Sequence, residues 1–320
     1  MSQLEQLKTM TTVVSDTGDI EAIRAFLPTD ATTNPTLIYA AAQKSEYRWL
    51  IDKAIREVAP IVTSPELKQR LLMDHIFVNF GLEILKIVPG RVSTEVDAHL
   101  SFDTDASVAS AQNLISLYEK AKVPRERILI KLASTWEGVR AAEILEMQGI
   151  HCNMTLMFSL EQAIACAEAN ATLVSPFVGR VLDWYKKNTN LQSYAPSDDP
   201  GVRVVRSIYH YFKKYGFRTQ VMGASFRNKS QIMELAGCDL LTISPQLLEE
   251  LETSDEPLER RLSLESAKND PVPRMEVDEA RFRYALNDDP MACDRLADGI
   301  RRFAQDWKKL ADYIILPLQT

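Results

Sequence analysis

The sequence predicts an α/β fold, a single closed (β/α)8 barrel of the TIM type. Short runs rich in β-branched residues alternate with longer helical patterns along most of the 320-residue chain, which is typical of βαβ units and a parallel sheet. Eight such runs occur, and eight βα units are the number that closes such a barrel. The hydrophobic content of 46% is enough for a large core.

The eight expected strands follow one another at spacings that leave room for a helix between most of them. In chain order they are TTVVSD (11–16), DATTN (30–34), RVSTEV (91–96), ILIKLA (128–133), HCNMTLM (151–157), TLVSPF (172–177), TQVMGAS (219–225) and LLTIS (240–244). Three glycines each lie between a helical pattern and the next strand: Gly149, Gly216 and Gly237. Helices often end there in a left-handed conformation, which favours glycine.

Expected helix starts agree with this alternation. Asn34 and Ser244 each precede a proline at the first helical position, so both are expected N-caps. Ser159 and Gln162 have the spacing of a capping box. These signals place helices directly after the second, fifth and eighth strands.

Three regions lie outside the simple repeat. Helical patterns fill about residues 45–88, between the second and third strands, and a polar stretch covers 253–274. Residues 276–318 are expected to form one or two terminal helices. Because no low-complexity linker or solenoid repeat is present, residues 1–320 are predicted to be one barrel domain with a C-terminal helical extension.

Composition argues against several functional classes. The chain has 37 basic and 44 acidic side chains, so a broad surface for nucleic acid or anionic lipid is not expected. The N-terminal MSQLEQLKTM lacks the apolar segment of a signal peptide, and no run reaches the roughly 20 apolar residues of a membrane helix. Cys152, Cys166, Cys238 and Cys293 fit neither a C-x-x-C site nor a disulfide framework. We therefore expect a cytoplasmic protein.

Metal and cofactor motifs are also missing from the sequence. The four histidines, at 75, 99, 151 and 210, form neither an H-x-H nor an H-E-x-x-H pattern. The glycines give no G-x-G-x-x-G and no G-x-x-x-x-G-K pattern for a nucleotide. We therefore expect no metal site and no nucleotide cofactor.

A lysine lies at the centre of the most aliphatic strand. The alternation that turns Ile128, Ile130 and Leu132 toward the outer helices sends Lys131 into the barrel. The same rule turns Glu95 inward on the third strand.

Polar residues recur on the inside of the other strands. On the fifth strand, Met154 and Leu156 are expected to face outward, and Asn153 and Thr155 inward. Further polar side chains are expected near the carboxyl ends of strands one, two, six and seven: Asp16, Thr32, Asn34, Ser175 (beside Phe177) and Ser225. Barrel enzymes assemble their active sites at this face, whereas a structural barrel fills it with aliphatic residues.

These residue types suggest imine chemistry. An amine removed from water can use its lone pair to attack a carbonyl, and a nearby carboxylate can carry the proton transfers that imine formation needs. A structural ion pair of Lys131 with Glu95 or Asp16 is the alternative. Single hydroxyls such as those of Thr32 and Ser175 commonly bond to nearby backbone instead.

Two arginines suggest a phosphate site. Arg180 and Arg227 each follow an expected strand near the start of a helix, where backbone N–H groups also favour anions. The alternative is that each is an ordinary surface or ion-paired arginine.

Several longer motifs resemble the transaldolase family, over nearly the whole chain and most closely its long bacterial and eukaryotic class. They are DATTNPTLI (30–38), VPGRVSTEVDAHLSFDT (88–104), ILIKLASTWEG (128–138), CNMTLMFS (152–159), SPFVGRVLDWY (175–185), MGASFRN (222–228) and NDDPMACDRLADGIRRF (287–303). The resemblance implies a (β/α)8 barrel that uses no metal or cofactor. It also implies sugar-phosphate substrates: a dihydroxyacetone unit moves from sedoheptulose 7-phosphate to glyceraldehyde 3-phosphate, in the non-oxidative pentose phosphate pathway.

The resemblance also implies residue roles. Lys131 matches the Schiff-base lysine, Glu95 the acid/base residue that works with Thr155 through a water, and Asp16 the carboxylate that handles the sugar hydroxyl. Residues matching the substrate site are Asn34, Asn153 and Ser175 for the dihydroxyacetone hydroxyls and Arg180, Ser225 and Arg227 for the phosphate, with Thr32 and Phe177 beside them.

Two positions distinguish transferases from the related fructose 6-phosphate aldolases, which are shorter barrels with glutamine in place of Glu95 and tyrosine in place of Phe177. This chain has the transferase residues at both. It departs from the family in PIVTSPELK (60–68) and in Tyr284, where tryptophan is common. An aldolase and a sugar-phosphate-binding protein without turnover remain alternatives. Many relatives are homodimers, so a homodimer is possible.

Overall fold

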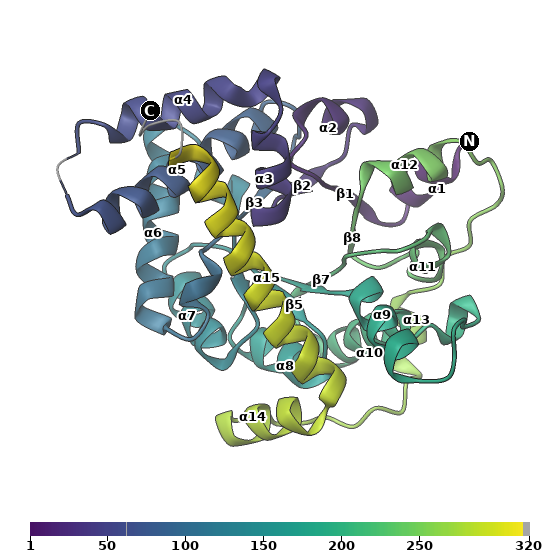
Figure 1. Ribbon diagram of the computed structural model, residues 1–320. Helices are drawn as coiled ribbons and strands as arrows, with labels where there is room; N and C mark the ends of the chain where they lie inside the picture. Colours follow the sequence, from purple (N-terminus) through teal and green to yellow (C-terminus); the bar gives the residue numbers. More distant parts are fainter. Residues whose placement is uncertain (62, 316–320) are drawn as a thin grey trace.

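The eight expected strands form a closed parallel barrel in the computed structural model, which describes residues 1–61 and 63–315 (Figure 1). The strands are β1 (Thr12–Asp16), β2 (Asp30–Thr32), β3 (Val92–Glu95), β4 (Ile128–Ala133), β5 (Cys152–Met157), β6 (Leu173–Pro176), β7 (Gln220–Gly223) and β8 (Leu240–Ile243). They pair in chain order, and β8 closes the ring by pairing in parallel with β1. The predicted (β/α)8 fold is therefore confirmed.

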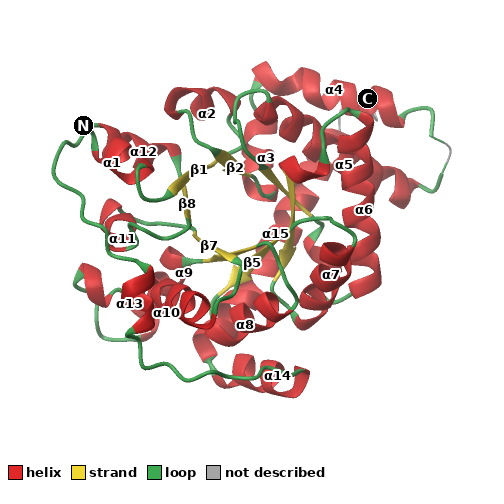
Figure 2. Cartoon of the chain, turned by 180° about the vertical axis from the view of Figure 1, so that it is seen from behind, coloured by secondary structure: helices red, strands yellow, loops and turns green. Residues whose placement is uncertain are grey.

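Helices surround this ring on its outside, as Figure 2 shows from behind. The helices are α1 (Gln3–Lys8), α2 (Ile20–Phe26), α3 (Pro35–Ala42), α4 (Arg48–Val58), α5 (Pro65–Leu85), α6 (Thr104–Lys120), α7 (Trp136–Met147), α8 (Leu160–Glu168), α9 (Val178–Asn188), α10 (Pro200–Tyr215), α11 (Lys229–Glu234), α12 (Pro245–Glu252), α13 (Leu264–Lys268), α14 (Glu279–Asp288) and α15 (Pro290–Ile315). Short 3-10 helices are η1 (Ser45–Tyr47), η2 (Ala98–Leu100), η3 (Arg125–Arg127) and η4 (Pro196–Asp198).

The helices outside the repeat agree with the sequence except at α13 and at α1, which precedes β1 and was not expected. The extra helices expected in 45–88 are η1, α4 and α5, and the expected terminal helices are α14 and α15. Residues 316–318 of the predicted extension lie outside the described residues. The polar stretch 253–274 contains α13, which we did not expect.

Within residues 1–61 and 63–315, no helix combines the length and the hydrophobicity needed to cross a membrane.

Three candidate site residues that were assigned to strands lie beyond them. The predicted range agrees at β4, whereas the other strands are shorter than expected. Asn34 is the N-cap of α3 and Phe177 the N-cap of α9. Ser225 follows β7 with a φ of 62°, a left-handed conformation outside the region of regular strands. All three still lie at the carboxyl end of the barrel.

The predicted helix ends are mostly confirmed. The three glycines expected at helix ends have φ values of 70°, 73° and 99°: Gly149, Gly216 and Gly237. Ser159 and Gln162 form the expected capping box, and the Asn34 side chain accepts the Leu37 N–H. Ser244 is in the N-cap position of α12, but its side chain makes no capping hydrogen bond within the described chain.

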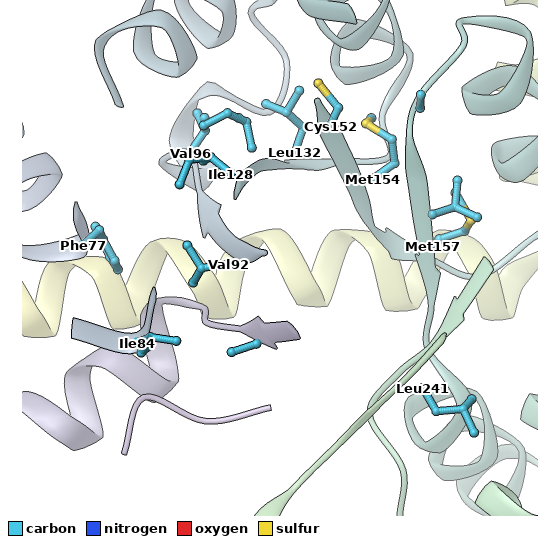
Figure 3. Packing of buried hydrophobic residues seen from close by; sticks show 14 of the residues in the cluster. Phe77, Ile84, Val92, Val96, Ile128, Leu132, Cys152, Met154, Met157 and Leu241 are labelled. Carbon is cyan, nitrogen blue, oxygen red and sulfur yellow. The ribbon is translucent and has the colours of Figure 1, made fainter. Parts of the chain in front are cut away.

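The core has two layers, one on each side of the strands. Val92, Ile128, Met154 and Leu241 are buried between the strands and the outer helices (Figure 3). The barrel interior holds a second, smaller cluster formed by Val14, Leu129, Leu173, Met222 and Leu240. Leu129 and Lys131 share one side of β4, so the lysine lies on the interior side, as the alternation predicted.

The alternation predicted for β5 is wrong at Leu156. The pairing register of β5 with β6 shifts between Met154 and Met157, and Leu156 has a φ of 53°. Such an irregularity adds a residue and reverses the side-chain direction beyond it. Met157 therefore joins Met154 in the outer cluster, whereas Leu156 packs with Phe158 at the carboxyl end of the barrel.

Helix α15 lies across the carboxyl ends of the strands, where Figure 1 shows it in yellow in front of the barrel. It contacts α3, α9, η2 and β5, and its Leu296 and Phe303 pack with Phe177. Gly299 permits this approach, because a Cβ there would lie 2.6 Å from Leu156 Cδ2, too close for a real contact. The terminal helix thus covers the face at which polar residues gather.

Strand β3 is held against its outer helices by a buried hydroxyl pair. Thr94 faces outward, and its Oγ1 lies 2.6 Å from the Tyr118 hydroxyl on α6. Gly81 on α5 makes room for that hydroxyl, because a Cβ at this position would overlap it. Fixing Thr94 outward directs the next residue, Glu95, into the barrel.

Candidate active site

Lys131 and Glu95 face each other on the neighbouring strands β4 and β3, which pair these two residues in register. Lys131 Nζ lies 3.2 Å from Glu95 Oε2, and the two side chains are only 5% and 4% exposed. The ammonium also donates a hydrogen bond of 3.2 Å to the Thr33 carbonyl. The ion pair that the sequence left as an alternative is therefore present. It lies toward the carboxyl ends of the strands.

Burial raises the pKa of the Glu95 carboxyl. The positive charge of Lys131 opposes this effect, and the nearby Asp16 adds to it. Glu95 Oε2 makes no aligned hydrogen bond to any residue that the structure describes. A carboxyl whose pKa is raised toward the working pH can both give and take a proton there.

Asp16 is the second carboxyl of the site. Burial raises its pKa, while Lys131, the Thr32 hydroxyl and Arg180 each lower it. Thr32 Oγ1 donates a hydrogen bond of 2.9 Å to Asp16 Oδ1. Two carboxylates, one ammonium and one guanidinium thus influence one another inside the barrel, so their charges can balance.

A hydrogen-bonded chain fixes the amide of Asn153. Its Nδ2 donates to Ser93 Oγ at 3.0 Å, and its Oδ1 accepts from Ser175 Oγ at 2.7 Å. Asn153 is fully buried, so both contacts orient the amide firmly. The structure therefore brings together two residues that the sequence placed inside, and adds Ser93 to them.

Thr155 projects a free hydroxyl. Its Oγ1 is buried and has no hydrogen-bond partner among residues 1–61 and 63–315. Its backbone carbonyl is held by the N–H and the hydroxyl of Ser134, at 2.7 and 2.8 Å. A buried hydroxyl without a protein partner is costly, so a water or a substrate oxygen is the partner that would satisfy it.

Arg180 is a buried cation between two aromatic rings. Its guanidinium carbon lies 4.9 Å from the centre of the Phe177 ring and 5.3 Å from that of Phe303. Burial, with Arg302 and Arg227 nearby, lowers its pKa to about 10, so it stays charged at neutral pH. Its Nη1 is buried without a hydrogen-bond partner in the described chain. An anion would satisfy both the charge and the donor.

Arg227 is placed differently from Arg180. It forms an ion pair with Asp183, with Nη2 and Oδ2 2.8 Å apart, and both side chains are over 40% exposed. Its Nη1 also lies 3.4 Å from Ser225 Oγ. The ion-paired alternative thus describes Arg227 here, although the Arg227 charge still acts on Arg180.

Four residues of this region were not found from the sequence. Ser93 and Thr242 are buried next to predicted residues, and each lies two positions from an inward residue, so the strand alternation could have found both. Phe303 covers Lys131, whose Nζ lies 6.0 Å from the ring centre, and Arg302 adds positive charge near Arg180. Both belong to α15, and no local pattern shows where that helix docks.

Metal-binding clusters and cysteine thiols are the other groups that could carry chemistry in this protein. In the described part of the chain, no three side chains of His, Cys, Asp or Glu are arranged to hold a metal ion. The four cysteines are free thiols, and Cys293 is the exposed one. The reactive groups on this face are thus the amine, the carboxyls and the arginine described above.

The chain matches known proteins over almost its entire length. The family model described as "Transaldolase/Fructose-6-phosphate aldolase" matches residues 13–314. A "Transaldolase" of Protochlamydia amoebophila (strain UWE25) is 57% identical over 97% of this chain and 96% of its own length. A "Transaldolase" of Cellvibrio japonicus (strain Ueda107) is 58% identical over 95% of both chains.

A eukaryotic relative gives the same result. A "Probable transaldolase" of Drosophila melanogaster is 56% identical over 98% of this chain and 95% of its own length. The closed eight-stranded barrel agrees with the fold expected from the sequence motifs. The chain therefore belongs to the transaldolase/fructose-6-phosphate aldolase family.

Proposed function

We propose that this protein is a transaldolase. It would transfer a dihydroxyacetone unit from sedoheptulose 7-phosphate to glyceraldehyde 3-phosphate, giving erythrose 4-phosphate and fructose 6-phosphate. The unit would be carried as a Schiff base on Lys131. The observation that carries this proposal is the buried pair of Lys131 and Glu95, which has Asp16 and the buried cation Arg180 around it.

The first half of the reaction uses Lys131 and Glu95. The neutral amine attacks the ketose carbonyl, and loss of water then gives the imine. Glu95 would supply the proton that leaves with this water, through a water bound to its carboxyl and to Thr155 Oγ1, which has no hydrogen-bond partner among the described residues. The same two groups would return a water when the product imine is hydrolysed.

The second half uses Asp16. The protonated imine accepts the electron pair of the breaking carbon–carbon bond, while Asp16 takes the proton of the neighbouring hydroxyl. An aldehyde leaves, and an enamine remains on Lys131. The acceptor aldehyde then forms the new bond as Asp16 gives its proton back, so each step balances in protons and electrons.

The remaining candidate residues would bind the substrate. We infer that Asn34, Asn153 and Ser175 hold the hydroxyls of the dihydroxyacetone unit. Arg180 would bind the phosphate, with Ser225 and Arg227 at its outer side. Thr32 acts on Asp16 through its hydrogen bond.

Transfer requires that the enamine waits for an acceptor. Phe177 and Phe303 are 6% and 1% exposed, and neither side chain offers a proton. Apolar rings next to Arg180 and Lys131 limit the access of water to the enamine. This favours transfer over release of free dihydroxyacetone.

A coupled assay distinguishes transfer from simple cleavage. Glyceraldehyde 3-phosphate release from fructose 6-phosphate is followed with a dehydrogenase, with and without erythrose 4-phosphate. Release that depends on erythrose 4-phosphate supports the proposal. Release without an acceptor would make the protein an aldolase, and no release in either case would leave Lys131 as a structural ion pair.

Replacing Glu95 with glutamine should slow imine formation and imine hydrolysis about 10²-fold, the lower end of the usual range for a lost general acid–base group. The glutamine keeps the size of the side chain but cannot exchange a proton. Sugar-phosphate binding should change much less. Pre-steady-state trapping of the imine with borohydride measures the rate directly.

A matched control for this variant is Glu143→Gln. Glu143 lies on the outer surface of α7, 40% exposed and paired with Arg140, so its variant should trap the imine at the wild-type rate. Equal trapping rates for Glu95→Gln and the wild-type protein would remove Glu95 from the acid–base role.

The domain organisation, the cellular compartment and the oligomeric state are also proposals. We infer that residues 1–320 act as one barrel domain in the cytoplasm, and that two copies associate. Tyr284 on α14 is 68% exposed and offers an aromatic contact on the terminal helices. Light scattering over a range of protein concentrations tests the dimer, and a constant monomer mass would contradict it.

A further inference from the structure

Thr242 is linked to Asp16 through a second hydroxyl. On β8, Thr242 Oγ1 lies 2.7 Å from Thr32 Oγ1 on β2, and Thr32 Oγ1 lies 2.9 Å from Asp16 Oδ1 on β1. Thr242 and Thr32 are 4% and 2% exposed. The three side chains thus form a buried chain on the neighbouring strands β8, β1 and β2, and it ends on a carboxyl of the proposed site.

The protons of this chain can be assigned. Each threonine hydroxyl carries one proton, whereas an ionised carboxylate only accepts. When Asp16 is ionised, the Thr32 proton must therefore point to Oδ1. The Thr32 oxygen then accepts, so Thr242 must be the donor in the pair at 2.7 Å.

A threonine is unexpected at this place in the barrel. Leu240, two residues earlier on the same side of β8, packs in the interior apolar cluster with Val14 and Met222. Valine has the same shape as threonine, and would fill the position without the cost of burying a hydroxyl. Thr242 offsets that cost through its hydrogen bond to Thr32. This suggests a functional role for the hydrogen bond.

We propose that Thr242 is a positioning residue that keeps the Thr32 hydroxyl directed at Asp16 and thereby stabilises the ionised carboxylate. Thr242 does not contact Asp16 itself, so it acts through Thr32. The link to catalysis rests on the proposed function, in which Asp16 must be ionised to accept the hydroxyl proton.

The charges around Asp16 set the direction of the effect. Burial raises the Asp16 pKa, and Lys131 on β4, Thr32 on β2 and Arg180 on α9 lower it. Glu95 on β3 is the other carboxyl that interacts with it. Weakening the Thr32 bond removes one lowering effect, so the Asp16 pKa should rise. Because the ionised form is the active one, the acid limb of the activity should then move to higher pH.

The test compares Thr242→Val with Thr242→Ser. Valine removes the hydroxyl at constant shape, and serine restores it. Asp16 is titrated by carbon NMR of its side-chain carboxyl in protein labelled at aspartate, with Asp16→Asn to assign the signal. We expect the midpoint to rise by about 0.3 to 1 pH unit in Thr242→Val, as partial loss of one neutral hydrogen bond would give. Thr242→Ser should keep the wild-type midpoint.

The activity profile gives a second readout. The acid limb of kcat should shift upward by the same amount in Thr242→Val, while KM for fructose 6-phosphate stays unchanged. Thr32→Val, which removes the donor itself, should shift the limb further in the same direction. Thr242→Ala replaces Thr242→Val if the valine variant does not fold.

Several outcomes would overturn the inference. Equal midpoints in Thr242→Val and the wild-type protein would remove Thr242 from this role. Equal shifts in the valine and serine variants would mean that packing, and not the hydroxyl, is responsible. The NMR titration needs no turnover, so it decides the inference even if the wild-type protein shows no transfer, which would contradict the proposed function instead.

Discussion

Replacing Lys131 with methionine is expected to abolish transfer of the dihydroxyacetone unit, with a loss of at least about 10⁴-fold, as for other covalent nucleophiles. Methionine fills a similar volume but has no amine to form the imine. The variant also leaves Glu95 without its ion-pair partner at 3.2 Å. Breaking a buried pair costs about 3–5 kcal/mol when the remaining charge persists. The Glu95 pKa is already raised by burial, so protonation of Glu95 should reduce this cost and leave the protein folded.

Lys213→Met is the matched control for this prediction. Lys213 forms an ion pair with Asp239 at 2.8 Å, with side chains that are 17% and 19% exposed. Asp239 directly precedes β8, so this pair lies at the opposite, amino end of the barrel. Its loss should lower the melting temperature without ending transfer. Measurable transfer by folded Lys131→Met, checked by circular dichroism, would contradict the Schiff-base account.

Replacing Arg180 with methionine should lower kcat/KM for fructose 6-phosphate about 10³-fold, equivalent to about 4 kcal/mol for a buried charge contact. The reason is that Arg180 has a buried donor without a partner in the part of the chain that the structure describes, so its charge is available to a phosphate. Activity with unphosphorylated fructose, although low, should fall much less, because that substrate loses only the effect of Arg180 on the pKa values of Asp16 and Glu95. The ratio of the two kcat/KM values is the measurement.

Two further arginines serve as controls for this effect. Arg227→Met should lose less than Arg180→Met, because Arg227 must first leave Asp183 to reach a phosphate. Arg206 on α10, which is paired with Glu234 on α11, should tolerate the same change. An equal loss with fructose and fructose 6-phosphate would indicate that Arg180 supports the fold and not the phosphate.

Much of the barrel could be predicted because its strands carry strong local signals. The range of β4 agreed with the aliphatic run around Lys131, and the same alternation placed Glu95 and Asn153 on the interior. The alternation failed at Leu156, because a register shift in β5 adds a residue there. A single strand sequence does not contain this shift, which depends on pairing with β6.

The covering of the site could not be predicted for a different reason. The sequence indicated a helix at α15, but its docking depends on distant contacts such as Gly299 against Leu156. Phe303 therefore gave no signal of its position near Lys131. Thr242 is an intermediate case, since the alternation of its strand could have placed it in the interior but could not show a bond to Thr32 on another strand.

The most direct test of the central claim is to trap the covalent intermediate. The wild-type protein is treated with fructose 6-phosphate and borohydride, then digested, and the peptides are analysed by mass spectrometry. The account predicts one reduced dihydroxyacetone unit on Lys131, and none when Lys131→Met is treated in the same way. An adduct on another lysine, or turnover with no adduct at all, would contradict it.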